Sequence, residues 1–234
     1  MSQRYSHLFF DLDHTLWDTD RNAEESLSEI FEELNLTQKG IPDFETFHAK
    51  YKAHNERLWG LYSDNKVGKD AVRLHRFVHT LQDFDIHDQE IANAIADEFV
   101  LRTPRKQYLI PGTLELLDAL HTKYSLSIIT NGFSEAQHVK LDASGLSKYF
   151  DAVFISEEIG IHKPDPKIFH HAVHHSGAKS ISQCMMIGDT YQTDVFGALN
   201  AGMTAVHFAP NGNEKHNAPV ITIRSLLELL EHLY

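Results

Sequence analysis

Residues 8–16 of the chain read Leu8-Phe9-Phe10-Asp11-Leu12-Asp13-His14-Thr15-Leu16. The stretch opens on three consecutive apolar residues, which are typical of a strand buried on both faces of a parallel sheet. It continues with Asp11 and Asp13, whose side chains face the same way in an extended chain because they lie two positions apart. Two carboxylates on one side repel each other unless a cation or a shared proton lies between them. We therefore expect a buried strand that ends at a charged site.

Further along the chain, four more apolar runs alternate with helical patterns. The runs occupy residues 126–129, 152–155, 184–187 and 205–208. Ser134 can cap a helix that stops at Gly145, and Pro166 can open another that stops near Gly177. Continuous apolar runs separated by helices predict an α/β fold, with a doubly wound parallel sheet of the Rossmann-like type that is covered on both faces.

The segment 19–106 has a different pattern, because it carries few strand signals and its apolar residues recur at helical spacing. One clear stripe is formed by Leu27, Ile30, Phe31 and Leu34. We expect a helical insertion between the first strand and the rest of the sheet, long enough to bury a small core of its own. The sheet domain then comprises residues 1–18 and 107–234.

Composition limits the possible partners and location of the protein. The 234 residues include 33 acidic side chains against 21 Lys and Arg, which gives a formal net charge of −12. A negative surface repels phosphate backbones, so we expect no nucleic acid polymer as a partner. No apolar run reaches the roughly 18 residues of a membrane span, so we expect no membrane association. A single cysteine, Cys184, and a polar first segment without a signal-peptide pattern predict a cytoplasmic location.

Polar residues follow three of the expected strands, at the edge where open α/β sheets bind ligands. Besides the acidic pair of the first strand, they are Thr130-Asn131-Gly132, Asp189 and Asp194, with Lys163 between them in sequence. Carboxylates suit a hard divalent cation, for which we predict Mg²⁺, and Lys163 supplies a point charge for a phosphate. Thr130 and the amides after it can donate hydrogen bonds to phosphoryl oxygens. The set suits phosphoryl transfer, which needs positioning and charge neutralisation.

The same residues resemble, in the same order, the four motifs of the haloacid dehalogenase-like phosphatases. Residues 11–15 are similar to the first motif, DxDxT, and Thr130-Asn131-Gly132 is similar to the second. Lys163 with the proline after it resembles the third motif, and Gly188-Asp189 with Asp194 resembles the fourth, GDxxxxD. Four motifs in order are far more specific than any one of them alone. The resemblance covers the whole sheet domain and gives the helical insertion the place of a family cap domain.

The resemblance implies a role for each acidic residue. Asp11 is implied to be the nucleophile, which forms an aspartyl-phosphate. Asp13 is implied to be the general acid that protonates the leaving alcohol and then the base that activates water. Asp11, the backbone carbonyl of Asp13 and Asp189 are implied to hold Mg²⁺. Asp194 is implied to support that metal site.

The resemblance also implies a class of substrate. Thr130, Asn131 and Lys163 are implied to bind the phosphoryl group of a small phosphomonoester. The dehalogenases of this superfamily lack the second aspartate of the first motif, so Asp13 favours phosphate-ester chemistry over dehalogenation. The sequence carries no signal for the oligomeric state.

Residues beside the motifs are similar to those of bacterial pyrimidine 5′-nucleotidases of the same superfamily. They are Trp17 and the stretches 130–135 and 155–160. This similarity implies nucleoside 5′-monophosphates as the favoured substrates. Trp17 is the aromatic nearest to Asp11 in sequence, so we expect it to contribute to substrate specificity. The alternatives are a phosphatase for phosphoglycolate or sugar phosphates and, less favoured, a phosphomutase or a non-catalytic protein that binds a phosphorylated ligand.

Overall fold

The structure is a computed structural model that describes residues 4–64, 66–212 and 220–233. It divides into two compact units, Met1–Thr19 with Gln107–Tyr234 and, inserted between them in sequence, Asp20–Lys106. None of the helices in the described part of the chain is both long enough and apolar enough to span a membrane. The predicted roles of the units, a catalytic core and a cap, stay predictions.

The first unit is built on a parallel sheet, whose described strands follow the order β3-β2-β1-β4-β5-β6. The strands are β1 (His7–Phe10), β2 (Ser125–Thr130), β3 (Ala152–Ile155), β4 (Cys184–Gly188), β5 (Thr204–Phe208) and β6 (Ile221–Ile223). The predicted doubly wound parallel α/β fold is confirmed, because the strand order runs outward from β1 in both directions. The edge strand β6 was not among the predicted strands.

Alternate residues of each central strand enter two separate apolar cores, one on each face of the sheet. In β1, Leu8 and Phe10 join one core and Phe9 joins the other. In β4, Met185 and Met186 divide in the same way. Because both faces are covered, Leu8, Phe9, Phe10 and all five residues of β4 are buried, and this explains the unbroken apolar runs of the sequence.

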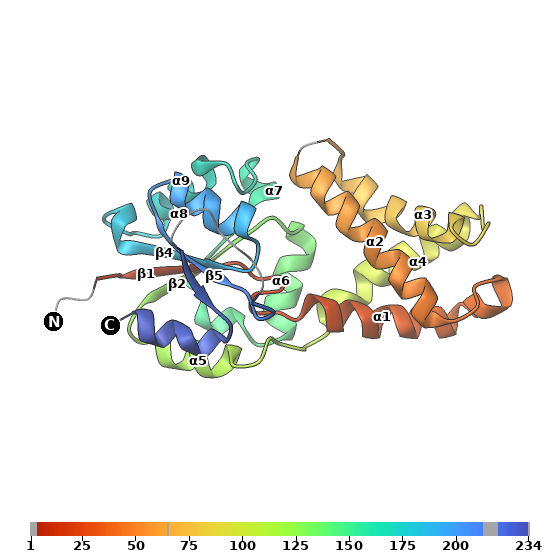
Figure 1. Cartoon of the computed structure of the whole chain (residues 1–234), viewed down its shortest axis with the longest axis horizontal. Coiled ribbons are helices and arrows are strands. Elements are labelled where there is room, and N and C mark those ends of the chain that lie inside the picture. Colours follow the sequence, from red (N-terminus) through yellow and green to blue (C-terminus); the bar gives the residue numbers. More distant parts are fainter. Residues whose placement is uncertain (1–3, 65, 213–219, 234) are drawn as a thin grey trace. The chain divides into compact units, whose positions relative to one another are not determined.

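Helices cover both faces of this sheet (Figure 1). They are α5 (Thr113–Leu120), α6 (Ser134–Ala143), α7 (Ser156–Ile159), α8 (Pro166–His175), α9 (Gly197–Asn200), a π-helical segment (Tyr191–Phe196) and 3₁₀ segments (Ser147–Tyr149, Ile181–Gln183 and Leu226–His232). The core on one face includes α5 and the C-terminal 3₁₀ segment, and the core on the other face includes α8 and α9. The expectation that Ser134 caps α6 is wrong, because Phe133 occupies the cap position and Ser134 is the first helical residue.

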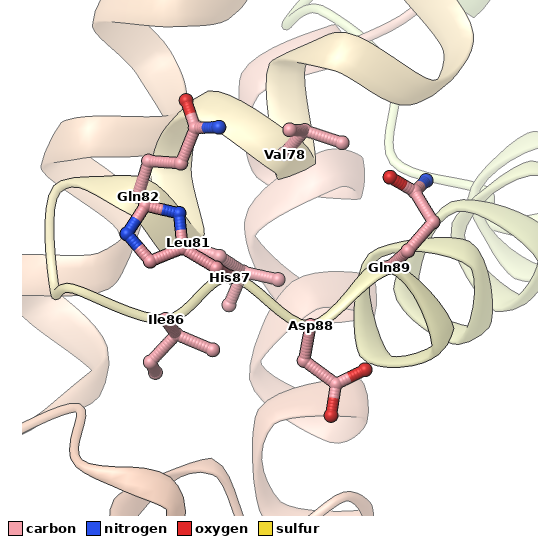
Figure 2. A pocket seen from close by; sticks show the side chains of 7 residues that line it. All are labelled: Val78, Leu81, Gln82, Ile86, His87, Asp88 and Gln89. Carbon is pink, nitrogen blue, oxygen red and sulfur yellow. The ribbon is translucent and has the colours of Figure 1, made fainter.

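The second unit is helical, as expected. It contains α1 (Thr19–Glu33), α2 (Phe44–Ser63), α3 (Arg76–Gln82), α4 (Gln89–Arg102), 3₁₀ segments (Leu36–Lys39 and Thr103–Arg105) and a π-helical turn (Ala71–His75). Its apolar core draws on all four α-helices. A hollow between the end of α3 and the start of α4 is lined by Val78, Leu81, Gln82, Ile86, His87, Asp88 and Gln89 (Figure 2). The Asp88 carboxylate in this hollow caps α4 by accepting hydrogen bonds from the amides of Glu90 and Ile91.

The chain leaves the first unit and returns to it at neighbouring points. The amide of Asp18 donates to the carbonyl of Tyr108 over 3.0 Å. Trp17 and Leu109 form an antiparallel bridge beside this bond. We call these four residues the joint. They close the first unit on itself, although 87 residues, Asp20 to Lys106, are inserted there.

Candidate active site

Three adjacent strands deliver the predicted site residues to one edge of the sheet. β1 lies between β2 and β4, so the chain segments that follow these strands emerge side by side. Asp11 follows β1, Thr130 is the last residue of β2, and Asp189 follows β4. The amide of Asp11 continues the ladder by donating to the carbonyl of Ile187 over 2.9 Å. The sheet therefore fixes the backbone from which the site is built.

Lys163 lies between two carboxylates at the centre of the site. Its Nζ is 2.5 Å from Oδ1 of Asp11 and 2.7 Å from Oδ1 of Asp194. It also donates to the carbonyl of Ile129 over 2.8 Å, and the residue is only 2% exposed. Burial opposes the charged form of this lysine, but Asp11 and Asp194 more than offset it and raise its pKa above the ordinary value. Lys163 is thus a fixed cation.

Three carboxylates meet around this lysine. One ligand atom from each of Asp11, Asp189 and Asp194 lies within 4.8 Å of the others. Burial is the main cause that raises the pKa of Asp11 well above its ordinary value, against the charge of Lys163. Burial and the charge of Asp194 raise the pKa of Asp189 to about 7. When all three are ionised, their charge exceeds that of the one lysine, so the oxygen donors fit a hard divalent cation such as Mg²⁺.

Thr15 and Gly188 hold two of these carboxylates in place. The Thr15 hydroxyl donates to Oδ1 of Asp189 over 3.0 Å and accepts from the amide of Asp189 over 3.1 Å. A Cβ on Gly188 would lie 2.3 Å from Oδ2 of Asp194 and 2.5 Å from its Cβ. A glycine is therefore needed where β4 ends, because the Asp194 side chain packs against it.

The polar residues after β2 bind the loop that carries Lys163. The Asn131 side chain donates to the carbonyl of Lys163 and accepts from its amide, both over 2.9 Å. The Thr130 hydroxyl accepts from the amide of Gly132 over 3.0 Å. In this structure the Asn131 carboxamide therefore holds Lys163 in position. The phosphoryl contacts expected of Thr130 and Asn131 stay predictions.

The Asp13 carboxylate is held by a separate set of donors. Its Oδ1 lies 2.6 Å from Nζ of Lys140 and 2.9 Å from the Thr19 hydroxyl, and its Oδ2 accepts from Gln137 over 2.9 Å. Burial favours the neutral acid, but Lys140 and Gln137 outweigh it and lower the pKa of Asp13 to about 2. The Asp13 side chain is not part of the three-carboxylate group, and the predicted metal contact concerned its backbone carbonyl.

Gln137 and Lys140 are site residues that our sequence analysis missed. Both lie on α6, which follows the predicted Thr130-Asn131-Gly132 motif after one intervening residue. Their spacing of three places them on one face of the helix. Their burial is visible only in the structure, so the sequence offered no local signal for their role.

Trp17 lies in the apolar core of the first unit and is 0% exposed. Its amide donates to the carbonyl of Leu12, which closes the loop after the first motif. The Nζ of Lys140 lies 4.5 Å from the centre of the indole ring. The ring therefore contacts a cation of the site and has no exposed face in this structure. Its predicted part in substrate specificity stays a prediction.

Known proteins are similar to this chain in sequence and fold over nearly its whole length. The chain is 32% identical over 232 residues to the pyrimidine 5′-nucleotidase YjjG of Escherichia coli (strain K12), covering 97% of this chain and 96% of that one. It is 29% identical to the pyrimidine 5′-nucleotidase PynA of Streptococcus pneumoniae (strain ATCC BAA-255 / R6), with 98% and 95% covered. The crystal structure of the HAD-hydrolase YfnB from Bacillus subtilis, bound to magnesium, superimposes with a TM-score of 0.88 at 28% identity, with 99% of each chain covered.

The family model of the haloacid dehalogenase-like hydrolases matches residues 5–202. The match includes every residue of the site described above, from Asp11 to Asp194. With these matches and the sheet that carries the four motifs, the chain is shown to be an enzyme that belongs to the haloacid dehalogenase-like hydrolases.

Proposed function

We propose that this enzyme is a Mg²⁺-dependent phosphomonoesterase that hydrolyses nucleoside 5′-monophosphates, with pyrimidine nucleotides favoured. The observation that carries the proposal is the group formed by Asp11, Asp189 and Asp194 around the buried Lys163. A phosphoryl group needs both a cation to neutralise it and a nucleophile in line with it, and this group offers both. The nucleotidase names of two relatives support the choice of substrate.

The proposed reaction has two steps. In the first, a carboxylate oxygen of Asp11 bonds to phosphorus while the bond from phosphorus to the leaving oxygen breaks, and Asp13 gives its proton to that oxygen. In the second, water attacks phosphorus, its proton passes to Asp13, and the bond from phosphorus to Asp11 breaks. The products are an alcohol, here a nucleoside, and inorganic phosphate.

The residues of this chain divide the work between them. Lys163 holds one oxygen of Asp11 against a fixed cation, which restricts the rotation of the nucleophile. Mg²⁺, when bound by Asp11, Asp189 and Asp194, would supply charge neutralisation for the phosphoryl oxygens. The low pKa of Asp13 makes it a carboxylate at neutral pH, the form that accepts a proton from water. The negative charge of a bound phosphoryl group favours the protonated form, which the first step requires.

The test is phosphate release from a panel of nucleoside monophosphates, sugar phosphates and phosphoglycolate, with Mg²⁺ and with a chelator. We expect Mg²⁺-dependent release that is strongest for UMP, dUMP or dTMP. Release confined to sugar phosphates or phosphoglycolate would contradict the proposed nucleotide substrates, and the proposed two-step reaction would still stand. Release that persists in chelator would contradict the metal dependence.

The remaining parts of the proposal concern partners and location. The expected partner is the small phosphomonoester itself, and the acidic composition still argues against a nucleic acid polymer. The cytoplasmic location is proposed from the sequence, which has a single cysteine, Cys184.

A further inference from the structure

Two side chains from one helix bind the Asp13 carboxylate. Nζ of Lys140 lies 2.6 Å from Oδ1, and Nε2 of Gln137 donates to Oδ2 over 2.9 Å. The two residues lie three apart on α6, so they project from the same face of one rigid element. Because each donor takes a different oxygen, they fix the direction of the side chain and the rotation of the carboxylate plane together with the Thr19 hydroxyl, which also donates to Oδ1 over 2.9 Å. We call Gln137 and Lys140 the Asp13 clamp.

The burial of the clamp is not explained by packing alone. Gln137 is 1% exposed and Lys140 is 8% exposed, although both are usually surface residues. Among the described residues, Oε1 of Gln137 has no hydrogen-bond partner. A buried acceptor without a partner costs stability. The contact that Gln137 gains in return is the one to Asp13.

Two residues of the loops beside the clamp, Gly132 and Trp17, accommodate its side chains. A Cβ built on Gly132 would lie 1.6 Å from Nε2 of Gln137, so that position admits no side chain without displacing the clamp. On the other side, the fully buried ring of Trp17 lies 4.5 Å from Nζ of Lys140, where its π-face stabilises the ammonium group. Gly132 thus leaves space for Gln137, and Trp17 stabilises Lys140 in its place.

We propose that Gln137 and Lys140 are positioning residues, which act through Asp13 by orienting its carboxylate for proton transfer. This inference rests on the proposed function. Proton transfer is sensitive to distance and direction, so a carboxylate free to rotate spends less time where it can reach the leaving oxygen or the water. The clamp contacts neither Asp11 nor Lys163 among the described bonds, so its loss should affect kcat more than KM.

The test uses the full-length enzyme and substitutions that keep the length of each side chain. Lys140→Met and Gln137→Met remove the donors and retain apolar bulk against Trp17 and the helix. Lys148→Met is the matched control, because Lys148 is exposed and its ammonium also lies over an aromatic ring, that of Tyr149. We expect kcat to fall about tenfold to a hundredfold for each clamp variant, with KM within about twofold of wild type and no change for the control.

Two further variants separate positioning from a merely structural role. Lys140→Arg restores a cationic donor, and we expect it to recover most of the lost kcat. In an Asp13→Asn background, Lys140→Met should change kcat by less than about twofold, because the group through which it acts is already absent. Equal losses in the wild-type and Asp13→Asn backgrounds would overturn the inference, as would clamp variants as active as Lys148→Met.

Crystal structures of Lys140→Met and Gln137→Met provide a readout that does not depend on activity. We expect the Asp13 side chain to change its rotamer or to occupy more than one, whereas an unchanged carboxylate would overturn the inference. A wild-type enzyme that hydrolyses no phosphomonoester would contradict the proposed function. In that case a displaced Asp13 in the variant crystals would still support the clamp.

Discussion

At the residue scale, the proposed chemistry depends on one oxygen of Asp11. Lys163 holds Oδ1 of this residue at 2.5 Å, and an amide oxygen at the same place can accept the same hydrogen bond. Asp11→Asn is therefore a substitution that removes the nucleophile and retains the surroundings. It tests whether Asp11 acts as the nucleophile.

We expect Asp11→Asn to lower kcat by about a thousandfold or more, because an amide does not replace a carboxylate as nucleophile. Inhibitor binding by inorganic phosphate should largely persist, since Lys163 and the residues after β2 remain. Initial rates and phosphate titrations of the variant measure both quantities. The exposed Asp85→Asn serves as control, and turnover at the wild-type rate would remove Asp11 from the role of nucleophile.

At the scale of the elements, strand β4 ends in a contact that only glycine permits. Gly188 is followed by Asp189, and its own hydrogen faces the Asp194 side chain. The strand, the turn after it and the carboxylate that meets Lys163 are thus packed as one piece. A side chain added at residue 188 should therefore disturb the proposed Mg²⁺ site and leave the sheet in place.

We expect Gly188→Ala to raise the Mg²⁺ concentration for half-maximal activity by about tenfold or more. The new methyl group would lie 2.3 Å from Oδ2 of Asp194 and must push that side chain away from Lys163. Rates measured against Mg²⁺ concentration test this. Gly60→Ala is the control, because a Cβ at Gly60 meets nothing within 4 Å. Equal Mg²⁺ dependence in the two variants would show that Asp194 does not support the metal.

The sequence was sufficient to predict the strands of the sheet, except the edge strand β6. Leu8-Phe9-Phe10 and the similar runs are apolar throughout because both faces are covered, and short runs of this kind between helices are typical of a parallel sheet. Strand β6 has three residues, and its central Thr222 is exposed. So short an alternation is too weak a signal to distinguish a strand from a loop.

Among the site residues, those that carry a local pattern could be predicted. Asp11, Lys163 and Asp189 stand at strand ends or in recognisable motifs. From the sequence, Gln137 and Lys140 would be expected on the solvent-exposed face of a helix, since both are long polar residues. Their contacts are with a residue 124 and 127 positions earlier, and no local pattern reports a contact of that separation.

At the scale of the whole molecule, the buried carboxylates make stability depend on pH and metal. Folding raises the pKa of Asp189 from 3.8 to about 7. Its stabilising contribution is therefore complete below pH 3.8 and is lost as the pH rises toward 7, when the buried group must ionise. The shift corresponds to roughly 4 kcal/mol of unfolding free energy. Asp13 behaves in the opposite way, because its pKa is lowered to about 2: its stabilising contribution is complete above pH 3.8 and is lost as the pH falls toward 2.

In chelator, we expect Asp189→Asn to become more stable than the wild-type protein as the pH rises from about 4 to about 8, because the amide does not ionise. Added Mg²⁺ should restore the wild-type protein and leave the variant almost unchanged. Thermal unfolding at a series of pH values, with and without Mg²⁺, measures both effects. Parallel curves for the two proteins would show that Asp189 ionises freely in the folded state.

The joint has a consequence for how such a protein diversifies. The first unit is closed at the place of insertion by a backbone hydrogen bond between Asp18 and Tyr108 and by a β-bridge between Trp17 and Leu109. Recombination or redesign at this point would exchange an entire module without shifting the register of any strand. Such an exchange would pass on the residues proposed for the chemistry unaltered, because all of them lie outside the exchangeable piece.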